Sequence, residues 1–314
     1  MAYSSGGLIA ATDYNGFVGA STSATTGQLN AVWSTGNGAR GYGQSAISQA
    51  AATGGTVTAT QWSSLINSLN SVYFHQSGVG SGISAVTAGS TIAYLSSLSG
   101  ALGTIYTNGL SYASQGATTT GSVYSPNLTS VNTTAAQSMS FTRTITFASA
   151  DQARYFFNAG GQLNFISTSV TNNDASSRSA DLVALAGSYL VNISNIRATT
   201  NGGKSGTGGT VNTNNTALGY YSLTTSGQNI VSINSAAYTY TGDYVTAAIR
   251  SSGTAGSNGD TGSVVYLDFY LYSSARTAGE QWNQTLNVTW NHRVDIVYPE
   301  STNLTNSWGT VTVS

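Results

Sequence analysis

The 314-residue chain has very little charge, since only 6% of its residues are Asp, Glu, Lys or Arg, against roughly 25% in a typical soluble domain. Between Gly41 and Thr142 there is no charged residue of these types at all. A surface of Ser, Thr, Asn, Gln and Gly lacks the repulsion that keeps free monomers apart. We therefore expect this region to be buried against other subunits, with a solitary, protease-resistant secreted domain as the alternative.

Other absences narrow the class of protein further. Cysteine is absent, which excludes disulfides, thiolate metal sites and thiol catalysis. No run of about twenty apolar residues is present, so we expect no membrane insertion. A net charge of −1 and a single lysine, Lys204, offer no basic surface for nucleic acid. The N-terminal stretch MAYSSGGLIAATDYNG has no basic segment and no sustained apolar run, so we expect no secretory signal peptide.

Helical periodicity marks the first part of the chain. Thr58 and Gln61 have the spacing of a capping box, and the hydrophobic residue before them suits a staple. Apolar residues then recur at intervals of 3, 4 and 7, as on a helix that faces a core. The predicted core of this docking helix comprises Val57, Trp62, Leu65, Ile66, Leu69 and Tyr73.

Two more helices are expected around this one. An earlier helix begins at Thr12 or Asp13 and, after a break that contains glycine, carries Leu29, Val32 and Trp33. A third spans residues 90–109, with apolar residues 3 and 4 apart. Such spacing favours a contact between helices of one chain, with a short oligomer seam as the alternative; the residues are Leu95, Leu98, Leu102 and Ile105.

From residue 138 onward the hydrophobic period changes to two. Short alternating segments separated by Gly, Ser and Asn turns predict an antiparallel β-sandwich or jelly roll. We expect an α+β protein with a helical docking or oligomerisation module at 1–115, a polar connector at 116–137 and a sandwich at 138–314. Strands are expected at 140–148, 162–170, 189–198, 220–225, 229–234, 244–250, 263–274, 285–298 and 308–314, and helical inserts at 150–158 and 180–186.

The two histidines are interpreted as packing residues. His75 closes its helix ahead of SGVGSG, where a histidine is favoured by the helix dipole and can bond the last carbonyls. No acidic residue lies near it in the sequence to orient it as a base. Alternation places His292 on the apolar side of its strand, where a hydrogen-bonded core histidine is the usual occupant.

No pattern of residues predicts an active site, a metal site or a cofactor site. The ten carboxylates are thinly spread, and no nucleophile elbow, Walker loop or zinc-protease motif is present. Carboxylates that are far apart in the sequence can still meet in the folded chain, so a catalytic carboxylate pair is only partly excluded. The glycine-rich stretch 201–210 lacks the order of a phosphate loop and is interpreted as a hairpin tip. We expect a protein that is not an enzyme.

One strand has an unusual polar side. In residues 263–274, alternation places Val265, Leu267, Phe269 and Leu271 toward a core. The opposite side carries three tyrosines and an acid, which suit either stacking on sugar rings or a protein interface. The alternative is burial under a neighbouring element, with the acid paired to Arg293 or Arg276. The candidate interface or receptor surface is Tyr266, Asp268, Tyr270 and Tyr272.

Several short motifs occur in order along the chain. DYNGFV at 13–18 is followed by a Gly-Tyr-Gly-Gln turn at 41–44. The predicted helix that begins after Thr58 and carries Trp62 in its first turns then ends in His75-Gln76. ARYFFNAGGQLNF follows at 153–165. These stretches resemble virion structural proteins of tailed bacteriophages, especially marine and cyanobacterial ones. The resemblance covers about the first 80 residues and a short later piece, and it transfers no active-site residue.

The resemblance implies a virion structural protein that assembles in the host cytoplasm. A tail, baseplate or neck appendage is the expected location, held by the helical module with the β-domain outward. A head decoration protein and a carbohydrate-binding, receptor-binding module are the alternatives. Expected partners are further copies of the chain (a trimer is one option), other virion proteins and a host surface glycan.

Overall fold

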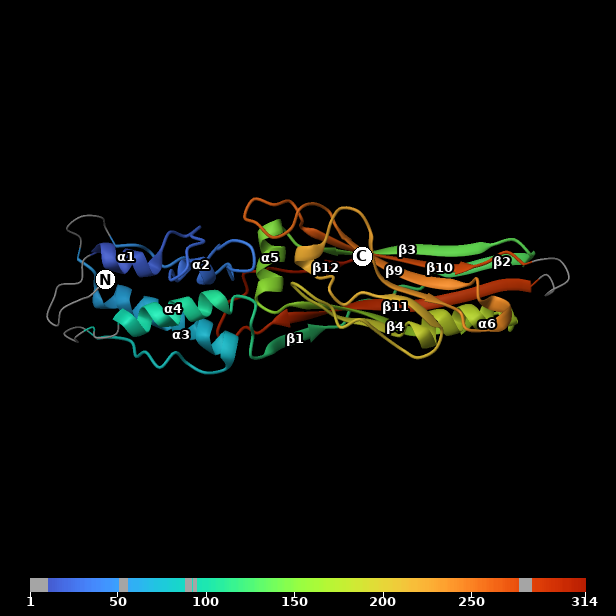
Figure 1. The fold of residues 1–314 in the computed structure, drawn as a ribbon, viewed down its shortest axis with the longest axis horizontal. Coiled ribbons are helices and arrows are strands. Elements are labelled where there is room, and N and C mark those ends of the chain that lie inside the picture. The colour runs from blue at the N-terminus through green and yellow to red at the C-terminus, as the bar shows by residue number, and fades with distance from the viewer. Residues whose placement is uncertain (1–10, 51–55, 88–91, 93–94, 277–283) are drawn as a thin grey trace.

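The computed structural model describes residues 11–50, 56–87, 92, 95–276 and 284–314. The molecule is elongated, with helices at its N-terminal end and a β-sandwich along the remainder (Figure 1). The predicted α+β fold with an antiparallel sandwich is confirmed. The helices are α1 (Ala11–Val18), α2 (Asn30–Trp33), α3 (Ala59–Ser77), α4 (Leu95–Thr107), α5 (Ala150–Asn158) and α6 (Ser177–Ala184), the last followed by a π-helical turn, Leu185–Tyr189.

Local sequence sets both ends of α3. Thr58 Oγ1 accepts a hydrogen bond from the backbone N–H of Gln61 at 3.2 Å, and the Gln61 side chain accepts one from the Thr58 N–H at 2.9 Å. These bonds satisfy N–H groups that the start of a helix leaves without partners. At the other end Gly78 has φ 77°, and its N–H donates to the Phe74 carbonyl. A left-handed residue at this position ends the helix.

The apolar side of α3 forms the interior of the helical end. The Trp62 ring meets the Tyr14 ring edge-on, with 5.5 Å between centroids. Side chains of α4 pack into the same core, so the predicted α4 seam is a contact within the chain. The start of that helix near Ser90 lies outside the described residues. Of the predicted docking-helix core, Trp62, Leu65, Ile66 and Leu69 are buried, and Val57 and Tyr73 pack at its margin.

Two antiparallel sheets face each other in the sandwich. Sheet A has the order β1-β11-β4-β5-β6, with β2 also paired to β11, and sheet B has the order β12-β3-β10-β9-β8-β7. The strands are β1 (Gln115–Thr119), β2 (Asn127–Thr133), β3 (Gln137–Thr146), β4 (Gln162–Asn172), β5 (Asn192–Ile196), β6 (Lys204–Ser205), β7 (Thr210–Asn214), β8 (Gln228–Asn234), β9 (Tyr244–Ser251), β10 (Val264–Ser273), β11 (Gln284–Pro299) and β12 (Thr312–Val313).

Three segments differ from what the sequence predicts. Residues 116–137, expected as a polar connector, contribute β1 and β2, which pair with β11. Residues 220–225, expected as a strand, begin with a 3-10 turn at Tyr220–Ser222. The glycine-rich stretch is a crossing between sheets and not a hairpin tip, because β6 belongs to sheet A and β7 to sheet B. For β1 and β2 the pairing partner lies more than 150 residues further along the chain, whereas β6 and β7 pair with the neighbouring strands β5 and β8.

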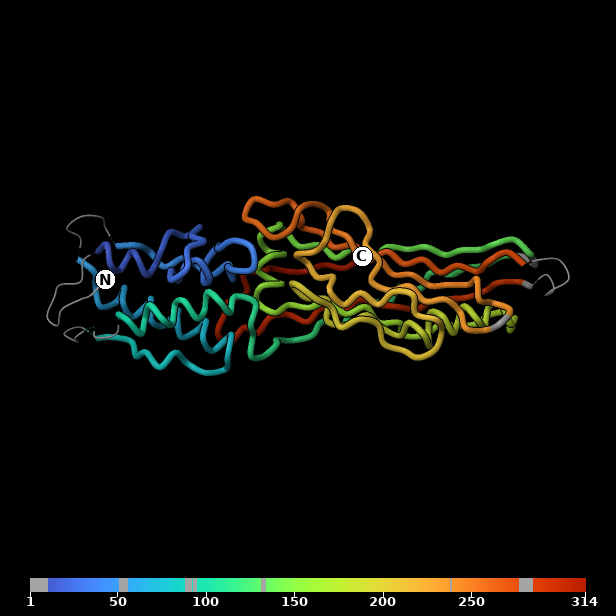
Figure 2. The backbone as a smooth tube through the Cα atoms, in the orientation of Figure 1, coloured from blue at the N-terminus to red at the C-terminus, as the bar shows by residue number. Residues whose placement is uncertain are grey.

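The C-terminal part of the chain enters the helical end. After β11 ends at Pro299, the backbone runs among the helices before it returns to β12 (Figure 2). The Gln44 side chain makes two hydrogen bonds to the backbone of this segment. Its Nε2 donates to the Thr305 carbonyl and its Oε1 accepts from the Thr305 N–H, each at 2.9 Å. The predicted helical module at 1–115 therefore also contains residues from the end of the chain.

Helix α5 lies across the long axis where the helices meet the sandwich (Figure 1). Arg154 donates from Nη1 to the Arg40 carbonyl and from Nη2 to the Thr35 carbonyl, both at 2.7 Å. Asn158 donates to the Gly41 carbonyl at 3.1 Å. Gly41 has φ 95°, and a Cβ there would lie 2.0 Å from the Thr35 oxygen. We call these contacts of α5 and of the C-terminal segment with the helical end the junction.

Candidate functional site

The two sides of β10 differ sharply in burial. Its inward side chains are at most 1% exposed, whereas its outward ones are half-buried. The outward side chains are partly accessible to solvent, because the inward aliphatic and aromatic residues already supply the core. We define the tyrosine face as this outward side with the facing residue of β9; it comprises Tyr244, Tyr266, Asp268, Tyr270 and Tyr272.

The tyrosine rings of this face contact one another across β9 and β10. The Tyr244 and Tyr272 rings lie 4.9 Å apart between centroids, and the Tyr270 and Tyr272 rings 6.0 Å apart. Burial and these neighbours raise the pKa of Tyr244 above its ordinary value. Its hydroxyl therefore stays protonated at neutral pH and can donate a hydrogen bond.

Asp268 is paired within the same face. Arg250 Nε donates to Asp268 Oδ2 at 2.7 Å, and the two side chains are each 31% exposed. The guanidinium also lies over the Tyr266 ring at 4.0 Å from its centroid. The predicted partners of Asp268 are wrong, since Arg276 pairs with Asp243 and Arg293 with Asp295. The register of β9 and β10 places Arg250 diagonally opposite Asp268, within hydrogen-bond distance.

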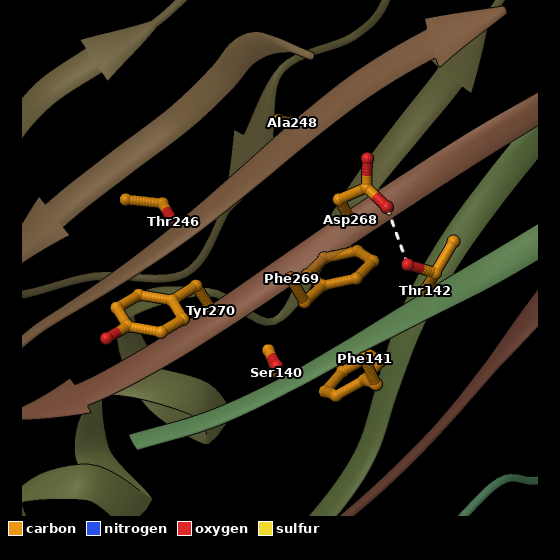
Figure 3. A pocket seen from close by; sticks show the side chains of 8 residues that line it. All are labelled: Ser140, Phe141, Thr142, Thr246, Ala248, Asp268, Phe269 and Tyr270. Atoms are coloured by element: carbon orange, nitrogen blue, oxygen red, sulfur yellow. Dashed lines mark hydrogen bonds between the residues drawn. The ribbon is translucent and has the colours of Figure 1, made fainter. Parts of the chain in front are cut away.

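A shallow hollow of about 460 Å³ lies between Tyr270 and Asp268. Ser140 and Thr246 flank the Tyr270 ring from the two neighbouring strands (Figure 3). At the other end, the Thr142 hydroxyl donates to Asp268 Oδ1 at 2.6 Å. The hollow therefore joins an aromatic ring, small hydroxyls and a carboxylate on one open surface.

His75 is buried and contacts an acid from the far end of the chain. Its Nδ1 lies 3.0 Å from Glu300 Oε1, and its Nε2 has no partner among the described residues. The expected bond from the ring to the last helix carbonyls is therefore not formed. Burial opposes ionisation of Glu300, but hydrogen bonds from His75 and from the N–H groups of Asn303 and Thr302 outweigh it and lower its pKa to about 2. This pair joins α3 to the C-terminal segment.

His292 lies on the inward side of β11, as the alternation predicts. It is fully buried, and its ring stacks on Phe141 at 4.2 Å between centroids. Its Nδ1 lies 3.2 Å from the Trp290 carbonyl. Burial, with a small contribution from nearby Arg143, lowers the His292 pKa to about 4 despite that hydrogen bond. At neutral pH it is a neutral core residue.

A buried cluster of two acids and two arginines was not foreseen. Asp243 pairs with Arg276 at 2.7 Å, and Arg178 of α6 donates to Ser273, which in turn donates to Asp243. Asp181, the second acid of the cluster, accepts a hydrogen bond from Ser235. Burial and the neighbouring Asp243 raise the Asp181 pKa to about 6, although the Ser235 bond lowers it. The acids lie in separate elements, so no local pattern in the sequence pointed to their meeting.

Within the described part of the chain, no three His, Asp or Glu side chains converge as metal ligands would. The helices described there are also too short or too polar to cross a membrane. Comparison of the chain with protein-family models, with curated proteins and with solved structures finds no match. The tyrosine face is therefore the candidate functional site on its own geometry.

Proposed function

We propose that the chain is a non-enzymatic structural component of a tailed-phage virion, in a tail, baseplate or neck appendage. The observation that carries this proposal is that the two ends of the elongated molecule differ. Helices form one end and the β-sandwich forms the rest (Figure 1), and the sandwich carries the partly accessible tyrosine face. In this arrangement the helical end attaches to the particle and the sandwich projects from it.

Two further observations support the proposal. The region from Gly41 to Thr142 has no charged residue, which suits a surface covered by other subunits. Three of the four motifs that resemble virion proteins also contribute to the junction, through Gln44, His75 and Arg154. A junction that fixes the two parts would hold the sandwich at a constant angle to the particle.

Immunogold labelling of purified particles, with antibodies raised against the chain, tests the location. We expect gold at the tail, baseplate or neck. Gold distributed over the head would instead favour the second location, a head decoration protein. If the chain is missing from purified particles by mass spectrometry, the structural role is wrong.

A carbohydrate-binding module is the second candidate function, and the hollow beside Tyr270 favours it. The two functions are compatible, because a projecting part of a virion is where a host surface would be contacted. The first concerns the helical end of the molecule and the second concerns sheet B, so they are tested separately.

A further inference from the structure

We propose that the tyrosine face binds a neutral, hexose-containing glycan, with the Tyr270 ring as the platform under one sugar ring and Asp268 as the acceptor of its hydroxyls. The proposal concerns the outward side of sheet B. It rests on the second proposed function, carbohydrate binding, and is independent of whether the chain is part of a virion.

The shape and chemistry of the hollow fit one or two sugar units. Its volume of about 460 Å³ lies within the usual range for small-ligand pockets, about 300–1,000 Å³. A tyrosine ring offers an apolar surface to the C–H side of a pyranose while its hydroxyl stays hydrogen-bonded. The hydroxyls of Ser140 and Thr246 lie on either side of the Tyr270 ring, from β3 and β9 (Figure 3). They are placed to bond the rim of a sugar seated there.

Asp268 is held in position without using all of its acceptor capacity. Its carboxylate accepts from Thr142 at 2.6 Å and from Arg250 Nε at 2.7 Å, with a longer contact to Arg250 Nη2 at 3.4 Å. An ionised carboxylate has about four acceptor sites. Because its side chain is 31% exposed, the remaining acceptor capacity can face solvent or the hydroxyls of a ligand. A sugar hydroxyl matches such an acceptor.

The charge of the face selects a neutral ligand. Arg250 and Asp268 compensate each other at 2.7 Å, and the tyrosines and hydroxyl residues around them are neutral. An acidic glycan or a nucleic acid would bring negative charge next to Asp268, and among the residues that line the hollow and form the tyrosine face no second cation offsets it. A neutral hexose meets no such cost.

The outward side of sheet A differs in a way that supports this assignment. There Asn287 Oδ1 accepts from both Asn127 and Asn173 at 3.1 Å, and Asn291 donates to Ser169 at 2.9 Å. These polar groups bond one another across neighbouring strands and loops, and no tyrosine stands among them. Sheet A therefore provides a matched control surface on the same sandwich.

The test is a printed array of neutral hexose oligosaccharides and sialylated counterparts, probed with the full-length chain. We expect saturable retention on a subset of the neutral glycans only. Tyr270→Ala and Asp268→Asn should each weaken this retention at least tenfold. Tyr270→Phe, which keeps the ring, should weaken it less than Tyr270→Ala, and Asn291→Ala on sheet A should leave it unchanged. Thermal unfolding of each variant checks that the fold is retained.

Two results would overturn the proposal: no retention on any neutral glycan, and equal retention by the wild type and Tyr270→Ala. If retention is absent and Tyr270→Ala alters self-association of the chain in sedimentation, the face is assigned to a protein contact. Should Tyr270→Ala fail to fold, the nearly isosteric Asp268→Asn still decides between these outcomes.

Discussion

The junction and the tyrosine face both contain arginines, hydroxyls and carboxylates, but they use them differently. At the junction, Arg154 and Asn158 are at most 1% exposed and donate to backbone carbonyls of the helical end. On the tyrosine face, the Arg250 and Asp268 side chains are each 31% exposed and bond mainly each other. The polar contacts of the junction hold the sandwich to the helical end, whereas those of the tyrosine face join side chains of the same sheet.

The two regions differ in the cost of removing one side chain, because its hydrogen-bond partner is then left without a partner. A buried carbonyl without its donor costs about 1–3 kcal/mol, because water cannot reach it. On an open face water takes the place of the lost partner, so exposed ion pairs contribute about 0–1 kcal/mol. Polar groups that contribute little to the stability of the fold are therefore available to bind a ligand. Paired substitutions in the two regions can test this contrast.

Among substitutions of polar side chains, the largest effect is expected from Arg154→Met. This substitution removes the donor to the carbonyls of Arg40 and Thr35 and leaves Asp151 without its 2.8 Å partner. We expect the free energy of unfolding to fall by about 3–5 kcal/mol. Arg250→Met, its match on the tyrosine face, should lower it by at most about 1 kcal/mol. Denaturant unfolding at pH 7 measures both, and equal losses would contradict the contrast.

Glu300→Gln should produce the next largest loss, about 2–3 kcal/mol at pH 7. Because the folded-state pKa of Glu300 is lowered to about 2, its contribution is present above the unfolded-state pKa near 4.5 and is lost as the pH falls toward 2. The difference between the wild type and the variant should therefore shrink below pH 4.5 and close only at about pH 2 and below in urea unfolding. A difference that stays constant over this range would show that ionisation of Glu300 does not stabilise the junction.

Asp181→Asn should act in the opposite direction. The folded-state pKa of Asp181 is raised to about 6, so stability present below about pH 4 is lost as the pH rises through 6. An amide cannot ionise, and we expect the variant to gain about 1–3 kcal/mol at pH 7 and nothing below pH 4. Urea unfolding across this range measures the gain. A loss at pH 7 would mean that ionised Asp181 is well compensated by Arg276.

The smallest effect on stability is expected at Tyr270. Tyr270→Ala should change the free energy of unfolding by less than about 1 kcal/mol, since its ring lies on the half-buried outward side of β10 and not in the core. The adjacent substitution Phe269→Ala removes a ring that stacks on Phe165 at 4.0 Å, and should cost about 3–5 kcal/mol. Thermal or denaturant unfolding compares the two neighbours. A large loss at Tyr270 would make the tyrosine face part of the core.

Local signals in the sequence were enough for much of the fold. The capping box of Thr58 and Gln61 and the alternation along β10 act within a few residues, so both are readable from the sequence. The same periodicities predict the four buried α3 residues, Trp62, Leu65, Ile66 and Leu69, and the half-buried outward side of β10. β1 was missed because its residues are mostly exposed and polar, so its place in the sheet comes from pairing with β11 and not from an apolar pattern.

The polar contacts could not be predicted, because they join distant parts of the chain. His75 and Glu300 are 225 residues apart, and Gln44 and Thr305 are 261 apart. No spacing rule connects such pairs, and for His75 it was the lack of a nearby acid that suggested packing alone. The same limit explains the wrong partner for Asp268, since only the strand order places Arg250 beside it.

Hydroxyl-radical footprinting of the chain, free and in purified particles, tests the central claim most directly. We predict that labelling of Tyr266, Tyr270 and Tyr272 stays the same in the particle. Labelling of Phe74, which is 44% exposed on α3, should fall because the helical end is covered. Protection of the tyrosines together with unchanged labelling of Phe74 would contradict the account, since the sandwich and not the helices would then be the attached end.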